Sequence, residues 1–215
     1  MTLADKITST RILMAPIFFV IYLLPRFFPS IFAVTPLSGE ENLKFIGAPW
    51  TVPVLWIIFV ASEISDMLDG MIARKRGETS DFGKFFDPFA DTLTQVTYFF
   101  CFVIDGILPS LLFLAVLYRE FSILFIRNLM LKKGIAMGAR IGGKIKTLTY
   151  ILAGALALLA SSVLRLGMDG GFYRILTMAA TVVFIISVIM AIVSFFDYVS
   201  VYRGSSSNEI TNNRK

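Results

Sequence analysis

The stretch DMLDGMIARKRGETSDFGKFFDPFAD, residues 66–91, joins the end of one apolar segment to the start of the next. At fixed distances it places four acidic residues, two glycines, an alanine and an arginine, namely Asp66, Asp69, Gly70, Ala73, Arg74, Gly83, Asp87 and Asp91. Acidic side chains at membrane depth are costly, by about 2.5–3.5 kcal/mol each on insertion scales, so they mark functional sites. We therefore interpret this stretch as a site at the end of a membrane helix.

The rest of the chain is unusually apolar. Of its 215 residues 56% are hydrophobic and only 16% are charged, far from the composition of a soluble domain. Spans of about 20 apolar residues suffice to cross a bilayer, and such segments cover roughly residues 12–32, 52–72, 88–107, 111–130, 148–166 and 172–196. The sequence thus predicts an all-α, polytopic integral membrane protein with six transmembrane helices. One domain would cover residues 1–203, and a disordered cytoplasmic tail rich in serine and asparagine would cover residues 204–215.

Basic residues between these segments set the expected orientation. Most of them lie at the amino terminus, in the loops after the second and fourth spans and in the tail, whereas the opposite side holds only Arg26, Lys44, Arg165 and Arg174. By the positive-inside rule both termini and the 66–91 motif face the cytoplasm. Topology and anionic lipid explain these charges, so we expect contact with membrane lipids and no binding of nucleic acid.

Helical periodicity brings the acidic residues together. At 100° per residue, Asp66, Asp69, Gly70 and Ala73 share one stripe of a helix, and Asp87 and Asp91 form a second stripe one turn apart on the next. Pro88 suits the first turn of that next span. Two helices can therefore present two carboxylates each to a shared site.

The composition restricts the chemistry of such a site to oxygen ligands. The chain has no histidine and one cysteine, Cys101, so the four aspartates point to a hard cation such as Mg²⁺, Mn²⁺ or Ca²⁺, with positions left for substrate phosphates. Gly70 and Ala73 keep the helix surface low, and Arg74 offers a bidentate fork for phosphate. Gly83 lets the connecting turn approach a ligand.

The run from Asp66 to Asp91 resembles the signature of the CDP-alcohol phosphatidyltransferase family at every defining position. The resemblance implies a six-helix membrane enzyme, a homodimer, that displaces CMP from a CDP-linked lipid with an alcohol and uses two Mg²⁺ or Mn²⁺ ions. It also implies that Asp66, Asp69, Asp87 and Asp91 bind the metal ions and that Asp91 is the catalytic base. The CDP pocket would then be lined by Asp66, Asp69, Gly70, Ala73, Arg74 and Gly83.

A second group of residues bears on the acceptor alcohol. Arg119 and Arg127 lie inside the fourth span, and Lys144 and Lys146 follow in the next loop. Together they could bind an acceptor that itself carries phosphate. The pattern Arg-Glu, Arg, Gly-Lys-x-Lys-Thr, with Ile7-Thr8-x2-Arg11-Ile12 near the amino terminus, is similar to the bacterial phosphatidylglycerophosphate synthase branch. That branch implies CDP-diacylglycerol as donor, glycerol 3-phosphate as acceptor and a place in the inner (cytoplasmic) membrane with the site facing the cytoplasm.

Two alternatives to this interpretation remain open. Within the same reaction class, the acceptor could be an inositol phosphate, phosphatidylglycerol or serine. In a different class, intramembrane aspartates could form the ion path of a divalent-cation transporter. A transporter predicts acids spread across membrane depth, whereas these four crowd at one end.

Overall fold

In the computed structural model the described residues are 3–32, 35–36, 45–76, 81–132, 141–168 and 170–212. They form six helices: α1 (Leu3–Phe27), α2 (Thr51–Arg76), α3 (Asp81–Ile104), α4 (Ser110–Lys132), α5 (Ile141–Arg165) and α6 (Gly171–Asn212). Strands β1 (Thr35–Pro36) and β2 (Phe45–Ile46) pair antiparallel between α1 and α2. The all-helical prediction is therefore confirmed for these residues, with one two-residue ladder that the sequence did not predict.

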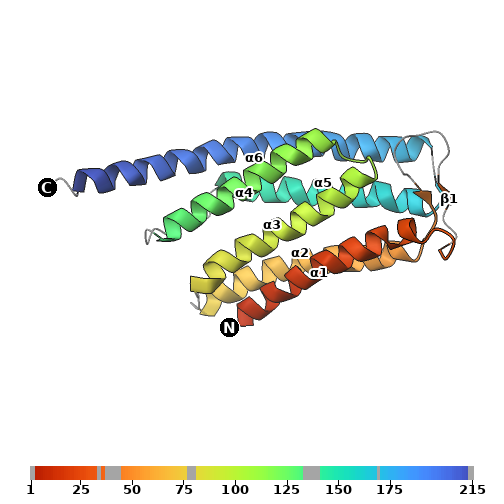
Figure 1. Cartoon of the computed structure of the whole chain (residues 1–215), viewed down its shortest axis with the longest axis horizontal. Helices are drawn as coiled ribbons and strands as arrows, with labels where there is room; N and C mark the ends of the chain where they lie inside the picture. Colours follow the sequence, from red (N-terminus) through yellow and green to blue (C-terminus); the bar gives the residue numbers. More distant parts are fainter. Residues whose placement is uncertain are drawn as a thin grey trace.

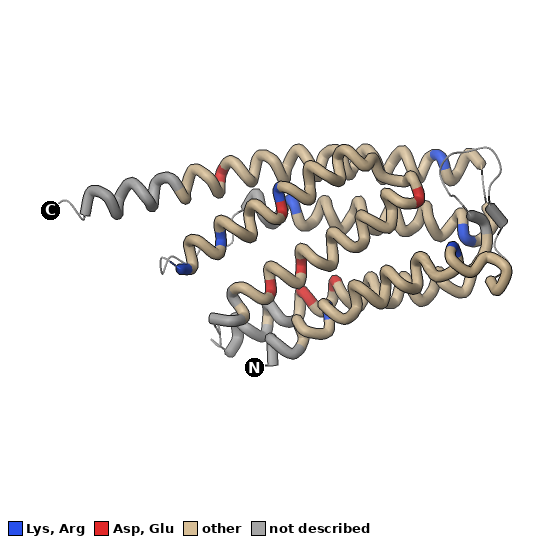
Figure 2. Tube along the Cα trace, in the orientation of Figure 1, with Lys and Arg blue, Asp and Glu red and all other residues tan. Residues whose placement is uncertain are grey.

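The helices form two groups: the first consists of α1, α2 and α3, and the second consists of α4, α5 and α6 (Figure 1). Helix α1 packs against α2 and α3, α5 packs along α6, and α4 contacts both α3 and α6. The groups lie close together at the end that carries β1 and spread apart toward the end that holds both termini (Figure 1). The aspartates of α2 and α3 and the basic residues of α4 therefore lie in the half of the molecule where the groups separate (Figure 2).

Aromatic side chains of α3 form the centre of the core. The Tyr98 ring lies 4.4 Å from Phe18 of α1 and 5.3 Å from Phe59 of α2, measured between ring centroids. On the other side of α3, the Phe99 ring lies 4.9 Å from that of Phe184 of α6. Adjacent residues of α3 thus pack against opposite helix groups, which fixes the rotation of α3 about its axis.

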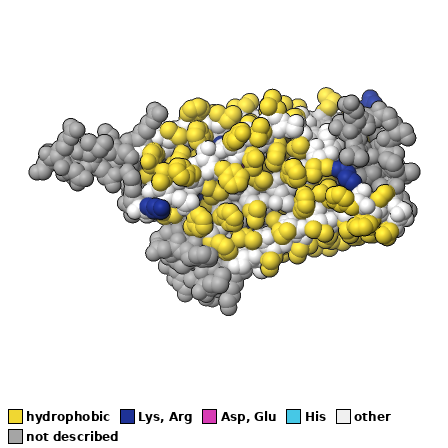
Figure 3. Space-filling view, in the orientation of Figure 1, with side chains coloured by type: hydrophobic (Ala, Val, Ile, Leu, Met, Phe, Trp, Pro, Cys, Tyr) yellow, Lys and Arg dark blue, Asp and Glu magenta, His cyan; other side chains and the backbone are white. Residues whose placement is uncertain are grey.

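Apolar side chains also cover the outside of the bundle. Hydrophobic atoms occupy most of the visible face between its two ends (Figure 3). Among the described residues, four helical segments are long and apolar enough to cross a membrane: Ile7–Phe27, Thr51–Leu68, Ile145–Arg165 and Gly171–Tyr202. Helices α3 and α4, with 24 and 23 residues, are of similar length and carry the charged residues of the third and fourth predicted spans.

Two helix boundaries differ from the sequence-based expectation. Helix α3 begins at Asp81, so Pro88 lies in its interior instead of its first turn. Helix α6 continues to Asn212 and includes most of the segment for which the sequence predicts a disordered tail. Extending an existing helix costs far less than starting one, and no proline interrupts α6 after Gly171.

A buried polar network closes the end near β1. The Arg165 side chain, 2% exposed, donates to Ser161 Oγ at 3.1 Å, Thr51 Oγ1 at 3.0 Å and the Tyr22 carbonyl at 3.0 Å. The Tyr22 hydroxyl donates to Asp105 Oδ2 at 2.5 Å. Arg165 thus connects α5 to α1 and α2. Through its hydrogen bond to Asp105, Tyr22 also connects α1 to the residue that follows α3.

We expect Arg165→Met to lower the thermal unfolding temperature by several degrees, because it leaves buried acceptors without a donor, at about 1–3 kcal/mol for each such group. The measurement is thermal unfolding of the protein in detergent. Arg174→Met, which removes an exposed arginine at the same end of the molecule, is the control and should change little. Equal shifts for the two variants would show that the buried network does not stabilise the fold.

Candidate active site

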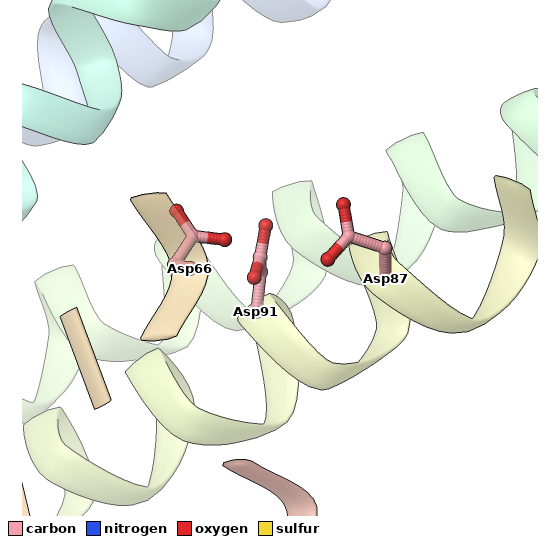
Figure 4. Close-up of side chains that lie close together, drawn as sticks. All are labelled: Asp66, Asp87 and Asp91. Atoms are coloured by element: carbon pink, nitrogen blue, oxygen red, sulfur yellow. The ribbon is translucent and has the colours of Figure 1, made fainter. Parts of the chain in front are cut away.

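Three of the four predicted carboxylates converge at the open end of the bundle. Asp66 extends from α2, and Asp87 and Asp91 extend from successive turns of α3 toward it (Figure 4). One oxygen of each carboxylate lies within 4.8 Å of one oxygen of each of the others. The two helical stripes expected from the sequence therefore meet at Asp66, Asp87 and Asp91.

This donor set is suited to a hard divalent cation. Carboxylate oxygens are the ligands that Mg²⁺ and Mn²⁺ prefer, and Mg²⁺ binds few protein carboxylates while keeping positions for water and phosphate. The three side chains are 35–45% exposed, so a solvated ion and a phosphate can reach them. The cluster could hold a metal ion together with a phosphate-bearing ligand.

Arg11 of α1 is a member of this site that the sequence interpretation missed. Its guanidinium group forms ion pairs with all three carboxylates, through Nη1 to Asp66 and Asp91 and through Nη2 to Asp87. From the sequence, Arg11 was expected only to contribute to the orientation and to the resemblance to the branch. The available signal was a charged residue at the start of an apolar helix, where burial requires an ionic partner.

A small polar pocket lies beside the carboxylates, toward the middle of the helices. Its walls come from α1, α2 and α3, and they comprise Arg11, Ser62, Glu63, Asp66, Asp91, Thr94 and Gln95. Glu63 lies one helical turn before Asp66, and its charge interacts with those of Asp66 and Arg11. The acidic region therefore extends one turn deeper than the sequence motif.

The other predicted pocket residues of the motif are only partly described. Gly83 lies in the first turn of α3 and is half-buried. The backbone of Asp69, Gly70, Ala73 and Arg74 belongs to α2. Their side-chain positions, like that of Lys144 in α5, lie outside the described part of the structure.

The predicted acceptor residues form a network on the second helix group. Arg119 Nη1 donates to Glu120 Oε1 at 2.9 Å, and Lys146 Nζ donates to the same oxygen at 2.8 Å. Arg119 also donates to α6, to the Ala191 carbonyl at 3.1 Å and to Ser194 Oγ at 3.2 Å. Glu120, for which the sequence predicted no role, is thus the anion that holds the two buried cations together.

Arg127 lies two turns further along α4 and is partly buried. Its Nη2 donates to the Tyr198 hydroxyl at 2.9 Å, and the guanidinium lies 5.4 Å from the centroid of that ring. The charge of Arg127 interacts with that of Asp87, and the charge of Lys146 with that of Asp91. Arg127 of α4 and Lys146 of α5 are therefore close enough to the carboxylates of α3 for their charges to interact, and such cations suit a ligand with phosphate groups.

The chain is similar to known proteins along most of its length. The family model of CDP-alcohol phosphatidyltransferase matches residues 1–193. The CDP-diacylglycerol--glycerol-3-phosphate 3-phosphatidyltransferase of Treponema pallidum is 35% identical over 203 residues, which are 94% of this chain and 89% of that protein. The proteins of the same name from Bacillus subtilis and Aquifex aeolicus are 30% and 32% identical, over 70% and 66% of this chain and 73% and 75% of theirs. The chain therefore belongs to the CDP-alcohol phosphatidyltransferase family.

Proposed function

We propose that this protein transfers the phosphatidyl group of CDP-diacylglycerol to glycerol 3-phosphate, giving phosphatidylglycerophosphate and CMP. The observation that carries the proposal is the convergence of Asp66, Asp87 and Asp91 on one site, where the charges of Asp87 and Asp91 interact with those of Arg127 and Lys146. The names of the most similar relatives support the same donor and acceptor. In this reaction an acceptor hydroxyl oxygen bonds to the phosphatidyl phosphorus, the bond from that phosphorus to the CMP oxygen breaks, and the hydroxyl proton is released.

The carboxylates would hold two divalent ions, Mg²⁺ or Mn²⁺, with Asp69 as the fourth ligand residue beside Asp66, Asp87 and Asp91. Bound there, such ions would neutralise the donor pyrophosphate and the charge of the leaving CMP. Asp91 lies one turn beyond Asp87 along α3 and, with Asp66, lines the polar pocket. We assign Asp91 to the acceptor hydroxyl, which it would orient and from which it would take the proton.

The donor and the acceptor would bind on opposite sides of this reacting centre. Gly70, Ala73, Arg74 and Gly83, with Asp66 and Asp69, would line the CDP pocket. Arg119, Arg127, Lys144 and Lys146 would bind the phosphate of the acceptor. Because Glu120 already neutralises part of the charge of Arg119 and Lys146, Arg127 offers the least compensated guanidinium of the described acceptor residues.

In the membrane, we propose six spans, with α3 and α4 joining the four apolar segments. Both termini would lie in the cytoplasm, and the site would open to the cytoplasmic face of the inner membrane. The presence of both termini and the carboxylates at one end of the bundle supports this orientation (Figures 1 and 2). We also propose a homodimer in the bilayer and one catalytic domain over residues 1–203.

The first test is CMP release by the purified protein with CDP-diacylglycerol and Mg²⁺, with each acceptor supplied separately. We expect release with glycerol 3-phosphate, formation of phosphatidylglycerophosphate, and loss of both in EDTA. Release with only an inositol phosphate, phosphatidylglycerol or serine would keep the reaction class and overturn the acceptor. Absence of release with every acceptor, together with Mg²⁺ or Mn²⁺ uptake into vesicles, would favour a transporter.

We expect Asp91→Asn to lower kcat by at least about a hundredfold, the scale of general acid–base catalysis, while CDP-diacylglycerol still binds. CMP release and binding of the donor to the folded variant are the two measurements. Asp197→Asn, on α6 and outside the carboxylate cluster, is the matched control. Near-normal turnover by a folded Asp91→Asn protein would exclude Asp91 as the base.

We expect Arg127→Gln to raise the KM for glycerol 3-phosphate about tenfold or more, because one charge-assisted hydrogen bond to phosphate contributes about 1.5–3 kcal/mol. Steady-state kinetics at varied acceptor and at varied donor separate the two substrates. Arg174→Gln serves as the control because its exposed side chain lies at the opposite end of the bundle. A change confined to the donor KM would place the acceptor site elsewhere.

A further inference from the structure

The ion pairs of Arg11 have an asymmetric geometry. The arginine side chain is 2% exposed, whereas Asp66, Asp87 and Asp91 are 35%, 45% and 35% exposed. The guanidinium therefore reaches the carboxylates from the bundle interior, and their outer side faces solvent. A cation from solvent and Arg11 approach the same carboxylates from opposite directions.

Electrostatics makes a resident cation necessary here. Three carboxylates with oxygens within 4.8 Å of one another repel, and water screens this repulsion only in part because their side chains are no more than 45% exposed. Both terminal nitrogens of Arg11 contact this group, Nη1 with two carboxylates and Nη2 with the third. A guanidinium can do this because its planar fork presents several donors at once, whereas an ammonium is a single point charge.

A bound divalent ion would compete with Arg11. A Mg²⁺–oxygen distance is about 2.0–2.1 Å. An ion among these carboxylates therefore binds the same oxygen lone pairs, and occupies the same space, as the Arg11 guanidinium in its ion pairs. The displaced guanidinium also needs a new partner, because an unpaired buried charge is expensive. Glu63 meets this need: it lines the same interior pocket as Arg11, and the charges of the two side chains interact.

We propose that Arg11 is the internal counter-cation of the carboxylate cluster, and that divalent ions entering from solvent displace its guanidinium from Asp66, Asp87 and Asp91 toward Glu63. Arg11 is thus a positioning residue: it keeps the carboxylates together between turnovers and sets how tightly the cluster binds metal. This inference rests on the proposed function, because it assumes that the cluster is the metal site.

The test measures Mn²⁺ binding to the full chain in detergent, from the electron paramagnetic resonance signal of free Mn²⁺. We expect Arg11→Gln to bind Mn²⁺ about tenfold more tightly, the change produced by removing competition worth about 1.4 kcal/mol. In EDTA the same variant should unfold at a lower temperature, because the carboxylates lose their partner. Arg26→Gln, which removes an ion pair to Asp105 at the other end of α1, is the control and should leave Mn²⁺ affinity unchanged.

A double-mutant cycle tests the role of Glu63. Glu63→Gln should weaken Mn²⁺ binding several-fold in the wild-type protein and clearly less in the Arg11→Gln protein. Only the wild-type protein has an Arg11 guanidinium that Glu63 can receive when the metal displaces it. Equal effects in the two backgrounds would overturn the transfer to Glu63. Mn²⁺ binding by Arg11→Gln that is no tighter than in the wild type would overturn the competition.

Two further variants keep the test decisive. If Arg11→Gln does not fold, Arg11→Lys replaces it, and its single ammonium should give tighter Mn²⁺ binding than the wild type; unchanged or weaker binding would overturn the proposal. Asp91→Asn separates the inference from the proposed function. If the wild type and Asp91→Asn bind Mn²⁺ equally, or neither binds it, the metal assignment itself fails; if Asp91→Asn alone loses binding, any failure concerns Arg11.

Discussion

Compensation of charge inside an apolar bundle is the constraint on which this structure depends. Carboxylates and guanidinium groups are expensive in a low-dielectric interior unless each has a partner with good geometry. Arg11 serves Asp66, Asp87 and Asp91 at the open end, whereas Glu120 serves Arg119 and Lys146 in the second helix group. The two groups carry opposite net charge where they face each other.

Helix α3 links the core to this chemistry. Its amino-terminal half carries Asp87 and Asp91, and its carboxyl-terminal half carries Tyr98 and Phe99, which pack against α1, α2 and α6. These aromatic contacts fix the rotation of α3, and a helix transmits that rotation along its length because successive residues keep 100° spacing. The directions of the two carboxylates are therefore determined by packing more than one turn away.

The sequence allowed much of this to be predicted, because short-range periodicity decides it. The helices and the meeting of Asp66 with Asp87 and Asp91 follow from apolar segments and from 3.6-residue spacing. The role of Arg11 could not be derived in this way, since it depends on how α1 packs between α2 and α3. For the same reason the partner of Arg119 and Lys146 was not predicted, although Glu120 is adjacent to Arg119. The interior position of Pro88 was missed because a proline was assumed to mark a helix start.

The continuity of α3 from Asp81 to Ile104 distinguishes two kinds of spacing within the 66–91 stretch. One residue inserted between Asp87 and Asp91 would turn them 100° apart from their present relation, and the carboxylates would no longer converge. An insertion between the end of α2 at Arg76 and the start of α3 at Asp81 leaves the register inside both helices intact. Insertions within the helices would therefore disrupt the candidate site. Insertions in the connection between α2 and α3 would lengthen the chain there and leave the relation between the carboxylates of each helix unchanged.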